Sequence, residues 1–123
     1  MPRVLVVDDH PLTVELLTAR LEAMGLEVDV AATGPTALQR VAAHQPDLVL
    51  LDVMMPDMDG FEVTRRLKSN PASAGVKVVL LTALGSSEDE ATGRSAGADG
   101  YLRKPFQKHE LRALVESMLQ NGR

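Results

Sequence analysis

One stretch decides how this chain folds, Asp47-Leu48-Val49-Leu50-Leu51-Asp52. Its aliphatic residues follow one another without the alternation of a strand that has one face in water. Such a continuous apolar run is typical of a strand buried on both faces, as in the centre of a parallel sheet. Asp52 then stands where the strand ends, in front of a turn-rich loop, Met54-Met55-Pro56-Asp57-Met58-Asp59-Gly60.

Shorter apolar runs flank this stretch and predict four more strands, at Val4–Val7, Leu26–Ala31, Val76–Leu81 and Asp99–Arg103. Between and after them, apolar residues recur at helical spacing. These helical stripes are Val14, Leu17, Leu21 and Met24; Ala37, Leu38, Val41 and Ala42, after Pro35; Val63, Thr64 and Leu67; and Leu111, Leu114, Val115, Met118 and Leu119.

One further helix is expected between the fourth and fifth strands. It begins with capping-type residues at Ser86–Asp89 and ends near Gly97. It is mostly polar and carries Gly93 inside, so its stability should be marginal. Five strands and five helices thus alternate, which predicts an α/β fold with a parallel sheet, helices on both faces and right-handed crossovers.

Composition narrows the class of protein. The 123 residues suit one compact domain, residues 1–123. The net charge of −4 argues against direct nucleic-acid binding, which usually needs a basic face. Cysteine is absent, so disulfides and thiolate zinc sites are excluded. No signal peptide or membrane-spanning run is visible, and we therefore expect a cytoplasmic protein without membrane contact.

Functional-type side chains follow four of the five predicted strands. Asp8 and Asp9 follow the first, Asp52 the third, Thr82 the fourth and Lys104 the fifth. Ligands of open parallel sheets bind beyond the carboxyl ends of the strands. The sequence therefore predicts a site at that edge.

The three aspartates at this edge favour a hard cation. Like charges at close range repel unless a cation is present, and oxygen ligands with few carboxylates suit Mg²⁺. An ammonium at Lys104 and a hydroxyl at Thr82 would complete a cradle for a transferring phosphoryl group. A carboxylate such as Asp52 can be the nucleophile and form an aspartyl phosphate.

Several neighbouring residues have plainer interpretations. His10-Pro11 is read as a helix start rather than as a ligand or base. Asp57 and Asp59 are read as turn residues before Gly60. The Met54, Met55 and Met58 side chains are read as loop packing, because thioethers do not suit Mg²⁺.

The chain resembles the receiver domains of two-component response regulators over essentially its whole length. The resemblance is carried by five motifs in order: Val6-Val7-Asp8-Asp9-His10, Asp47 to Gly60, Leu81-Thr82-Ala83, Ala96-Gly97-Ala98-Asp99-Gly100-Tyr101 and Lys104-Pro105-Phe106. It implies a flavodoxin-like, doubly wound fold with five parallel strands in the order 2-1-3-4-5 and five helices.

The resemblance also implies a role for each matching position. These are Asp52 as phosphoacceptor; Asp8, Asp9, Asp52 and the Met54 backbone carbonyl as Mg²⁺ ligands; Thr82 as switch hydroxyl; Tyr101 as aromatic switch; Lys104 as partner of the phosphoryl oxygens; and a cis bond before Pro105.

A signalling function follows from the resemblance. It implies phosphorylation by a sensor histidine kinase or phosphotransfer protein, and a change at the fourth helix, fifth strand and fifth helix that an output domain or target protein reads. Phosphorylation-dependent homodimers are a further possibility. The domain would catalyse only its own phosphorylation and a slow dephosphorylation, because large apolar residues, Met54 and Leu84, occupy the positions that gate the hydrolytic water.

Three rival functions are distinguishable. A phosphatase of the haloacid dehalogenase type needs a second aspartate at the position of Met54. A dinucleotide-binding domain needs a Gly-x-Gly-x-x-Gly motif after the first strand, and none is there. A scaffold that signals without phosphorylation needs none of the site residues. The sequence leaves open whether the receiver stands alone or opens a longer regulator, and which kinase and output it serves.

Overall fold

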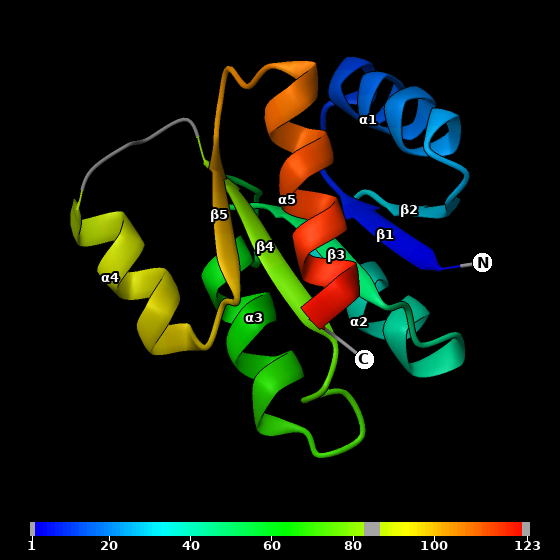
Figure 1. The fold of residues 1–123 in the computed structure, drawn as a ribbon. Coiled ribbons are helices and arrows are strands. Elements are labelled where there is room, and N and C mark those ends of the chain that lie inside the picture. The colour runs from blue at the N-terminus through cyan, green and yellow to red at the C-terminus, as the bar shows by residue number, and fades with distance from the viewer. Residues whose placement is uncertain (1, 83–86, 122–123) are drawn as a thin grey trace.

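The computed structural model describes residues 2–82 and 87–121 and contains one parallel sheet between two layers of helices (Figure 1). The elements alternate as β1 (Arg3–Val7), α1 (Pro11–Ala23), β2 (Glu27–Ala31), α2 (Gly34–Ala43), β3 (Leu48–Asp52), α3 (Gly60–Ser69), β4 (Lys77–Thr82), α4 (Ser87–Ala96), β5 (Gly100–Arg103) and α5 (Lys108–Asn121). The strand order is β2-β1-β3-β4-β5, which confirms the predicted fold.

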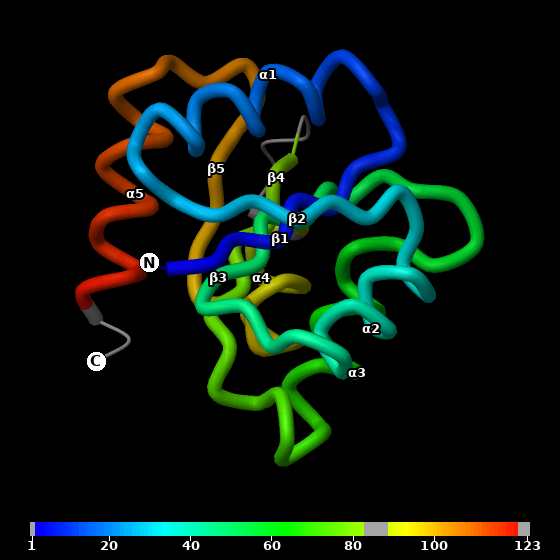
Figure 2. Tube along the Cα trace, turned by 90° about the vertical axis from the view of Figure 1, so that its right-hand side faces the viewer, coloured from blue at the N-terminus to red at the C-terminus, as the bar shows by residue number. Residues whose placement is uncertain are grey.

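The core consists of two aliphatic layers, one on each face of the sheet. Alternate strand residues turn to opposite faces. One face packs beneath α1 and α5, where Leu17, Leu21, Leu111 and Val115 are buried. The other face packs beneath α2 and α3. Figure 2 shows α1 and α5 on one side of the strands and α2 and α3 on the other. All five residues of β3 are buried, as its continuous apolar run predicts.

Four strands begin one residue later than expected, at Glu27, Leu48, Lys77 and Gly100, and an aspartate precedes two of them, β3 and β5. The preceding aspartates instead use their carboxylates as hydrogen-bond acceptors. Asp47 accepts from the backbone N–H of Arg3 at 2.8 Å, and Asp99 accepts from the backbone N–H of Val78 at 2.8 Å. These side chains therefore join neighbouring strands at the amino-terminal edge of the sheet.

Helix α4 packs against α3. Among its residues 89–96, Gly93 and Ala96 are buried. The predicted start at Ser86 lies outside the described residues. The helix ends at Ala96, and the next residue, Gly97, has a φ of +102°, a conformation that favours glycine. The backbone N–H of Ala98 donates to the Gly93 carbonyl at 3.0 Å.

The described part of the chain holds no helix that combines the length and the apolar character required to cross a bilayer.

Candidate functional site

The aspartates Asp8 and Asp52 lie side by side at the carboxyl ends of the central strands β1 and β3. Both are buried, with exposed fractions of 1% and 3%. Strand pairing continues past each strand end, because the Asp8 backbone N–H donates to the Ala31 carbonyl at 3.2 Å and the Val53 backbone N–H donates to the Leu81 carbonyl at 3.1 Å. The two carboxylates are therefore fixed to a rigid frame.

The loop after Asp52 is held close to β3 by Gly60. Its backbone N–H donates to the Val53 carbonyl at 3.0 Å, and a Cβ at this position would stand 2.6 Å from the Asp52 carbonyl oxygen. Only glycine fits so close to the backbone. The turn reading of the two loop aspartates is confirmed: Asp59 caps α3 by accepting from the Glu62 backbone N–H at 2.9 Å, and Asp57 has a φ of 68°.

The Lys104 side chain, which follows β5, reaches both aspartates. Its Nζ lies 3.3 Å from Asp8 Oδ2 and 3.4 Å from Asp52 Oδ1. Its backbone N–H donates to the Thr82 carbonyl at 2.7 Å, and the following Lys104–Pro105 peptide bond is cis. One ammonium thus faces two buried carboxylates, so the cluster keeps an excess of negative charge.

The environment raises the pKa of Asp52 above its ordinary value. Burial is the largest cause, because it removes the charged form from water, and the charge of Asp8 adds to it. Lys104 and a hydrogen bond from the Met54 backbone oppose the shift without cancelling it. Any additional positive charge nearby would therefore stabilise the ionised form of Asp52.

Four side chains gather into a group that could hold a metal ion. Asp8, Asp9, His10 and Asp52 each offer one ligand atom, and these atoms lie within 4.8 Å of one another. The carboxylate oxygens fit the hard-donor chemistry of Mg²⁺. The three aspartates were predicted; His10 was read only as a helix start. The structure places it at the N-cap of α1, with Pro11 next, and also turns its ring onto the carboxylates.

Thr82 and Tyr101 lie on the neighbouring strands. Thr82 ends β4 and is buried. Tyr101 pairs with Leu80, two residues before Thr82, so both side chains belong to the same face of the sheet. The Tyr101 hydroxyl is not at the acidic cluster. It donates to the Glu90 carbonyl of α4 at 2.5 Å, and burial raises the pKa of this phenol.

Of the two residues expected to gate water, the structure describes Met54. The Met54 side chain is 60% exposed beside the Asp52 loop, whereas Met55 is buried and Met58 is partly buried against the core, which agrees with a packing role for those two. Leu84 lies outside the described residues.

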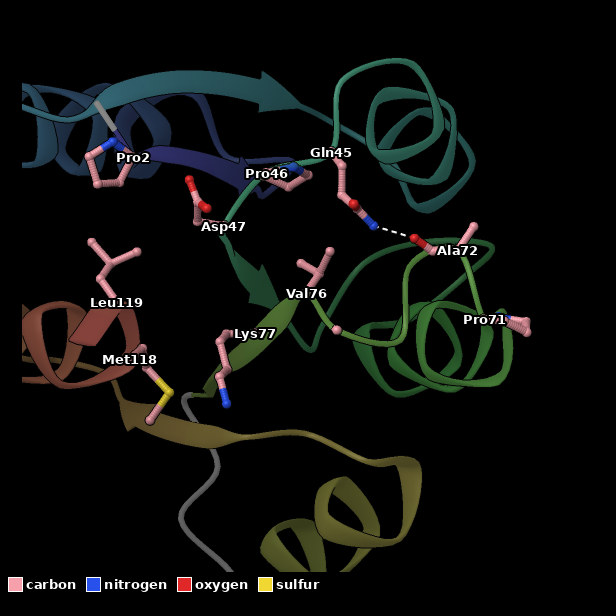
Figure 3. A pocket seen from close by; sticks show the side chains of 11 residues that line it. Pro2, Gln45, Pro46, Asp47, Pro71, Ala72, Val76, Lys77, Met118 and Leu119 are labelled. Atoms are coloured by element: carbon pink, nitrogen blue, oxygen red, sulfur yellow. Dashed lines mark hydrogen bonds between the residues drawn. The ribbon is translucent and has the colours of Figure 1, made fainter. Parts of the chain in front are cut away.

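A cavity of about 370 Å³ lies at the other edge of the sheet, where β1, β3 and β4 begin (Figure 3). Pro2, Pro46 and Val76 line it, and the Gln45 side chain donates to the Ala72 carbonyl across one side. Its acidic residue, Asp47, already accepts the Arg3 backbone N–H. The charged groups able to do chemistry converge instead at the Asp52 edge, which we take as the candidate site.

Comparison with known proteins shows which family the chain resembles. Residues 4–116 match the family model described as the response regulator receiver domain. The transcriptional regulator RpaA of Synechocystis is 41% identical over 98% of this chain and 50% of its own length. The response regulator PleD of Caulobacter vibrioides is 48% identical over 94% of this chain and 26% of its own length. The chain thus spans half or less of these two relatives.

A solved receiver structure shares the fold. The receiver domain of the sensor histidine kinase PA1611 from Pseudomonas aeruginosa, which has a magnesium ion coordinated in its active-site cleft, superposes with a TM-score of 0.90. It is 28% identical and covers 97% of this chain and 98% of that one. The family match over most of the chain, the strand order and the acidic edge lead to one conclusion: this chain belongs to the receiver domains of two-component response regulators.

Proposed function

We propose that this receiver domain takes a phosphoryl group on Asp52 in a Mg²⁺-dependent reaction and signals through α4, β5 and α5. The observation that carries the proposal is the convergence on Asp52 of a second buried carboxylate, Asp8, and the Lys104 ammonium, 3.4 Å from Asp52. The magnesium ion of the PA1611 receiver gives independent support.

The proposed chemistry is transfer to a carboxylate. An oxygen of Asp52 attacks phosphorus and forms an O–P bond, while the bond from phosphorus to the donor breaks. That bond is P–N in a phosphohistidine and P–O in an acyl phosphate. The leaving group departs with the bonding electrons, and the donor nitrogen takes up a proton. The product is an aspartyl phosphate.

The chain's own residues would hold the transferred group. Asp8, Asp9 and the Met54 carbonyl, with Asp52, are the proposed ligands of Mg²⁺, which when bound supplies positive charge to the phosphoryl oxygens. Lys104 would exchange its contact with the Asp52 carboxylate for one with a phosphoryl oxygen. Thr82 would donate its hydroxyl to another.

The conformational step would run through Tyr101. In this structure the Tyr101 hydroxyl bonds to the Glu90 carbonyl, so the tyrosine touches α4 directly. A movement of Thr82 toward the phosphoryl group would let Tyr101 turn inward and break that contact. The surface of α4, β5 and α5 then changes for an output domain or target protein.

The phosphoryl donor is proposed to be a sensor histidine kinase or a phosphotransfer protein in the cytoplasm. Leu12 and Leu16, one turn apart on α1, are 80% and 48% exposed. They follow His10 closely, so an apolar partner surface could dock beside Asp52. We propose no direct nucleic-acid contact for this domain, because its net charge is −4.

Intact-protein mass after treatment with acetyl phosphate tests the proposal. We expect one added phosphoryl group when Mg²⁺ is present and none after chelation or in Asp52→Asn. Asp57→Asn is the matched control: it is an exposed aspartate of the same loop, and asparagine tolerates its φ of 68°. Labelling of Asp52→Asn equal to that of Asp57→Asn would refute Asp52 as phosphoacceptor.

The same assay resolves the rival functions and the lifetime. Turnover of a phosphate ester would support a phosphatase, and no labelling of any variant would support a phosphorylation-independent scaffold. Size-exclusion chromatography of the labelled protein tests the predicted dimer. We also expect slow loss of the label, and faster loss from Met54→Asn, because a polar side chain there can hold the hydrolytic water.

A further inference from the structure

The ring of His10 is turned toward the acidic cluster although most of its side chain is in solvent. Its Nδ1 lies 3.1 Å from Asp8 Oδ1 and 3.2 Å from Asp9 Oδ1, with 65% of the side chain exposed. The backbone holds it there, because the His10 N–H donates to the same Asp8 oxygen at 2.9 Å and Pro11 begins α1 next.

These separations fit two ligands of one metal ion as well as they fit a hydrogen bond. Two bonds of about 2.1 Å that meet at a right angle place their ligand atoms about 3.0 Å apart. His10 Nδ1 stands at that distance from two different carboxylates, and it shares a group of four ligand atoms with Asp52.

A nitrogen donor changes which ions such a site prefers. Carboxylate and carbonyl oxygens suit Mg²⁺, whereas imidazole suits first-row transition metals, with affinity rising from Mn²⁺ through Co²⁺ and Ni²⁺. One imidazole beside three carboxylates should therefore raise the affinity for Ni²⁺ and Co²⁺ and leave that for Mg²⁺ almost unchanged.

We propose that His10 Nδ1 is an additional ligand at the Asp8–Asp9–Asp52 site and makes it selective for divalent transition metals over Mg²⁺. The inference rests on the proposed function only in that both place a cation at this cluster. It assigns His10 no part in phosphoryl transfer. It does imply that Ni²⁺ or Co²⁺ displaces Mg²⁺ from this chain at lower concentration than from a variant without the imidazole.

Calorimetric titration of the full chain with Mg²⁺ and with Ni²⁺ tests the proposal. The variant is His10→Asn, whose amide keeps a hydrogen-bonding atom near the Nδ1 position without the imidazole. The matched control is His44→Asn, because His44 is an exposed histidine at the end of α2, and it corrects for metal held by surface imidazoles.

We expect the Ni²⁺ dissociation constant of His10→Asn to rise about 10-fold or more, and its Mg²⁺ constant to change less than about two-fold. His44→Asn should match the wild type in both. The visible absorption of bound Co²⁺ should also differ between wild type and His10→Asn, because a nitrogen ligand has been lost.

Two results would overturn the assignment: equal changes for Ni²⁺ and Mg²⁺ in His10→Asn, which indicate a positioning role, or no change for either. Both leave the proposed function standing as long as Asp52 is labelled with Mg²⁺. Absence of Mg²⁺-dependent labelling in the wild type, with Ni²⁺ still bound through His10, would instead refute the proposed function alone.

Discussion

The acidic edge around Asp52 and the α4–Tyr101 region differ in what holds them. At the edge, Asp8 and Asp52 lie at the carboxyl ends of strands β1 and β3, where the chain is buried, and Lys104 compensates part of their charge. In the α4 region, a mostly polar helix rests on α3 through Gly93 and Ala96, with the Tyr101 hydroxyl bonded to its backbone.

The two regions therefore differ in the interaction that governs their stability, which is electrostatic at the edge and steric at α4. The edge has a rigid frame under electrostatic strain, which a cation or a phosphoryl group would change. Among the described residues 89–96 of α4, Gly93 and Ala96 are buried, and Gly93 leaves the space that the Tyr101 hydroxyl fills, so a small change in free energy can shift the helix.

Gly93→Ala should have the largest effect. A Cβ there would stand 1.7 Å from the Tyr101 hydroxyl oxygen, so the tyrosine must leave its place under α4. We expect a loss of about 2 kcal/mol in unfolding free energy, because overpacking and the lost hydrogen bond outweigh the gain in helix propensity. Urea denaturation measures it.

Spectroscopy can follow the same change at a single residue. Tyr101 is the only tyrosine, and the chain has no tryptophan. Its raised pKa should return toward the ordinary value in Gly93→Ala, which an absorbance titration reports. In a Tyr101→Ala background, Gly93→Ala should cost nothing or stabilise the protein; an undiminished cost there would contradict the steric fit.

Asp52→Asn should stabilise the metal-free protein, by on the order of 1 kcal/mol near neutral pH, because it removes a buried charge that repels Asp8. A raised pKa means that the folded state binds the proton more tightly, so this carboxyl favours folding at low pH and opposes it as pH rises through its folded pKa.

Thermal unfolding against pH measures this contribution. The advantage of Asp52→Asn over wild type should be full at neutral pH, shrink as pH falls through the raised pKa of Asp52, and shrink also when Mg²⁺ is added to the wild type. An advantage that stays constant with pH would mean that the edge is not electrostatically strained.

Arg94→Ala should have the smallest effect, at most about 0.5 kcal/mol. Arg94 pairs with Glu90 at 3.3 Å on the outer side of α4, and its side chain is 68% exposed, so solvent screens the pair. Urea denaturation beside Gly93→Ala provides the comparison. A cost above 1 kcal/mol would show that surface charge, rather than the Tyr101 fit, holds α4.

The acidic edge could be predicted from the sequence more fully than the packing of α4. Continuous apolar runs predicted buried strands, and the rule that ligands meet at strand ends predicted that Asp8, Asp52 and Lys104 would converge. The strand order came only with the family resemblance, since periodicity within a segment carries no information about which segments pair.

Contacts between side chains and the backbone could not be predicted from the sequence. Gly93 was read as a residue that weakens a helix, whereas the structure uses it as space for Tyr101. The inward turn of the His10 ring was missed because Pro11 made a helix start the simpler interpretation. A run of two carboxylates and an imidazole is a donor set, and that chemical signal could have been read.

The chain is anchored just after the carboxyl-terminal end of α4, and this affects how the helix can move. Lys68 of α3 donates to the Val76 carbonyl at 2.7 Å and pairs with Asp99 at 2.9 Å, and Asp99 holds the Val78 backbone of β4. This anchor lies just past Gly97, so we expect any tilt of α4 to pivot at this end. Ten residues span about 15 Å, and a swing of about 10° would carry the first turn through about 2.6 Å while this end stays still.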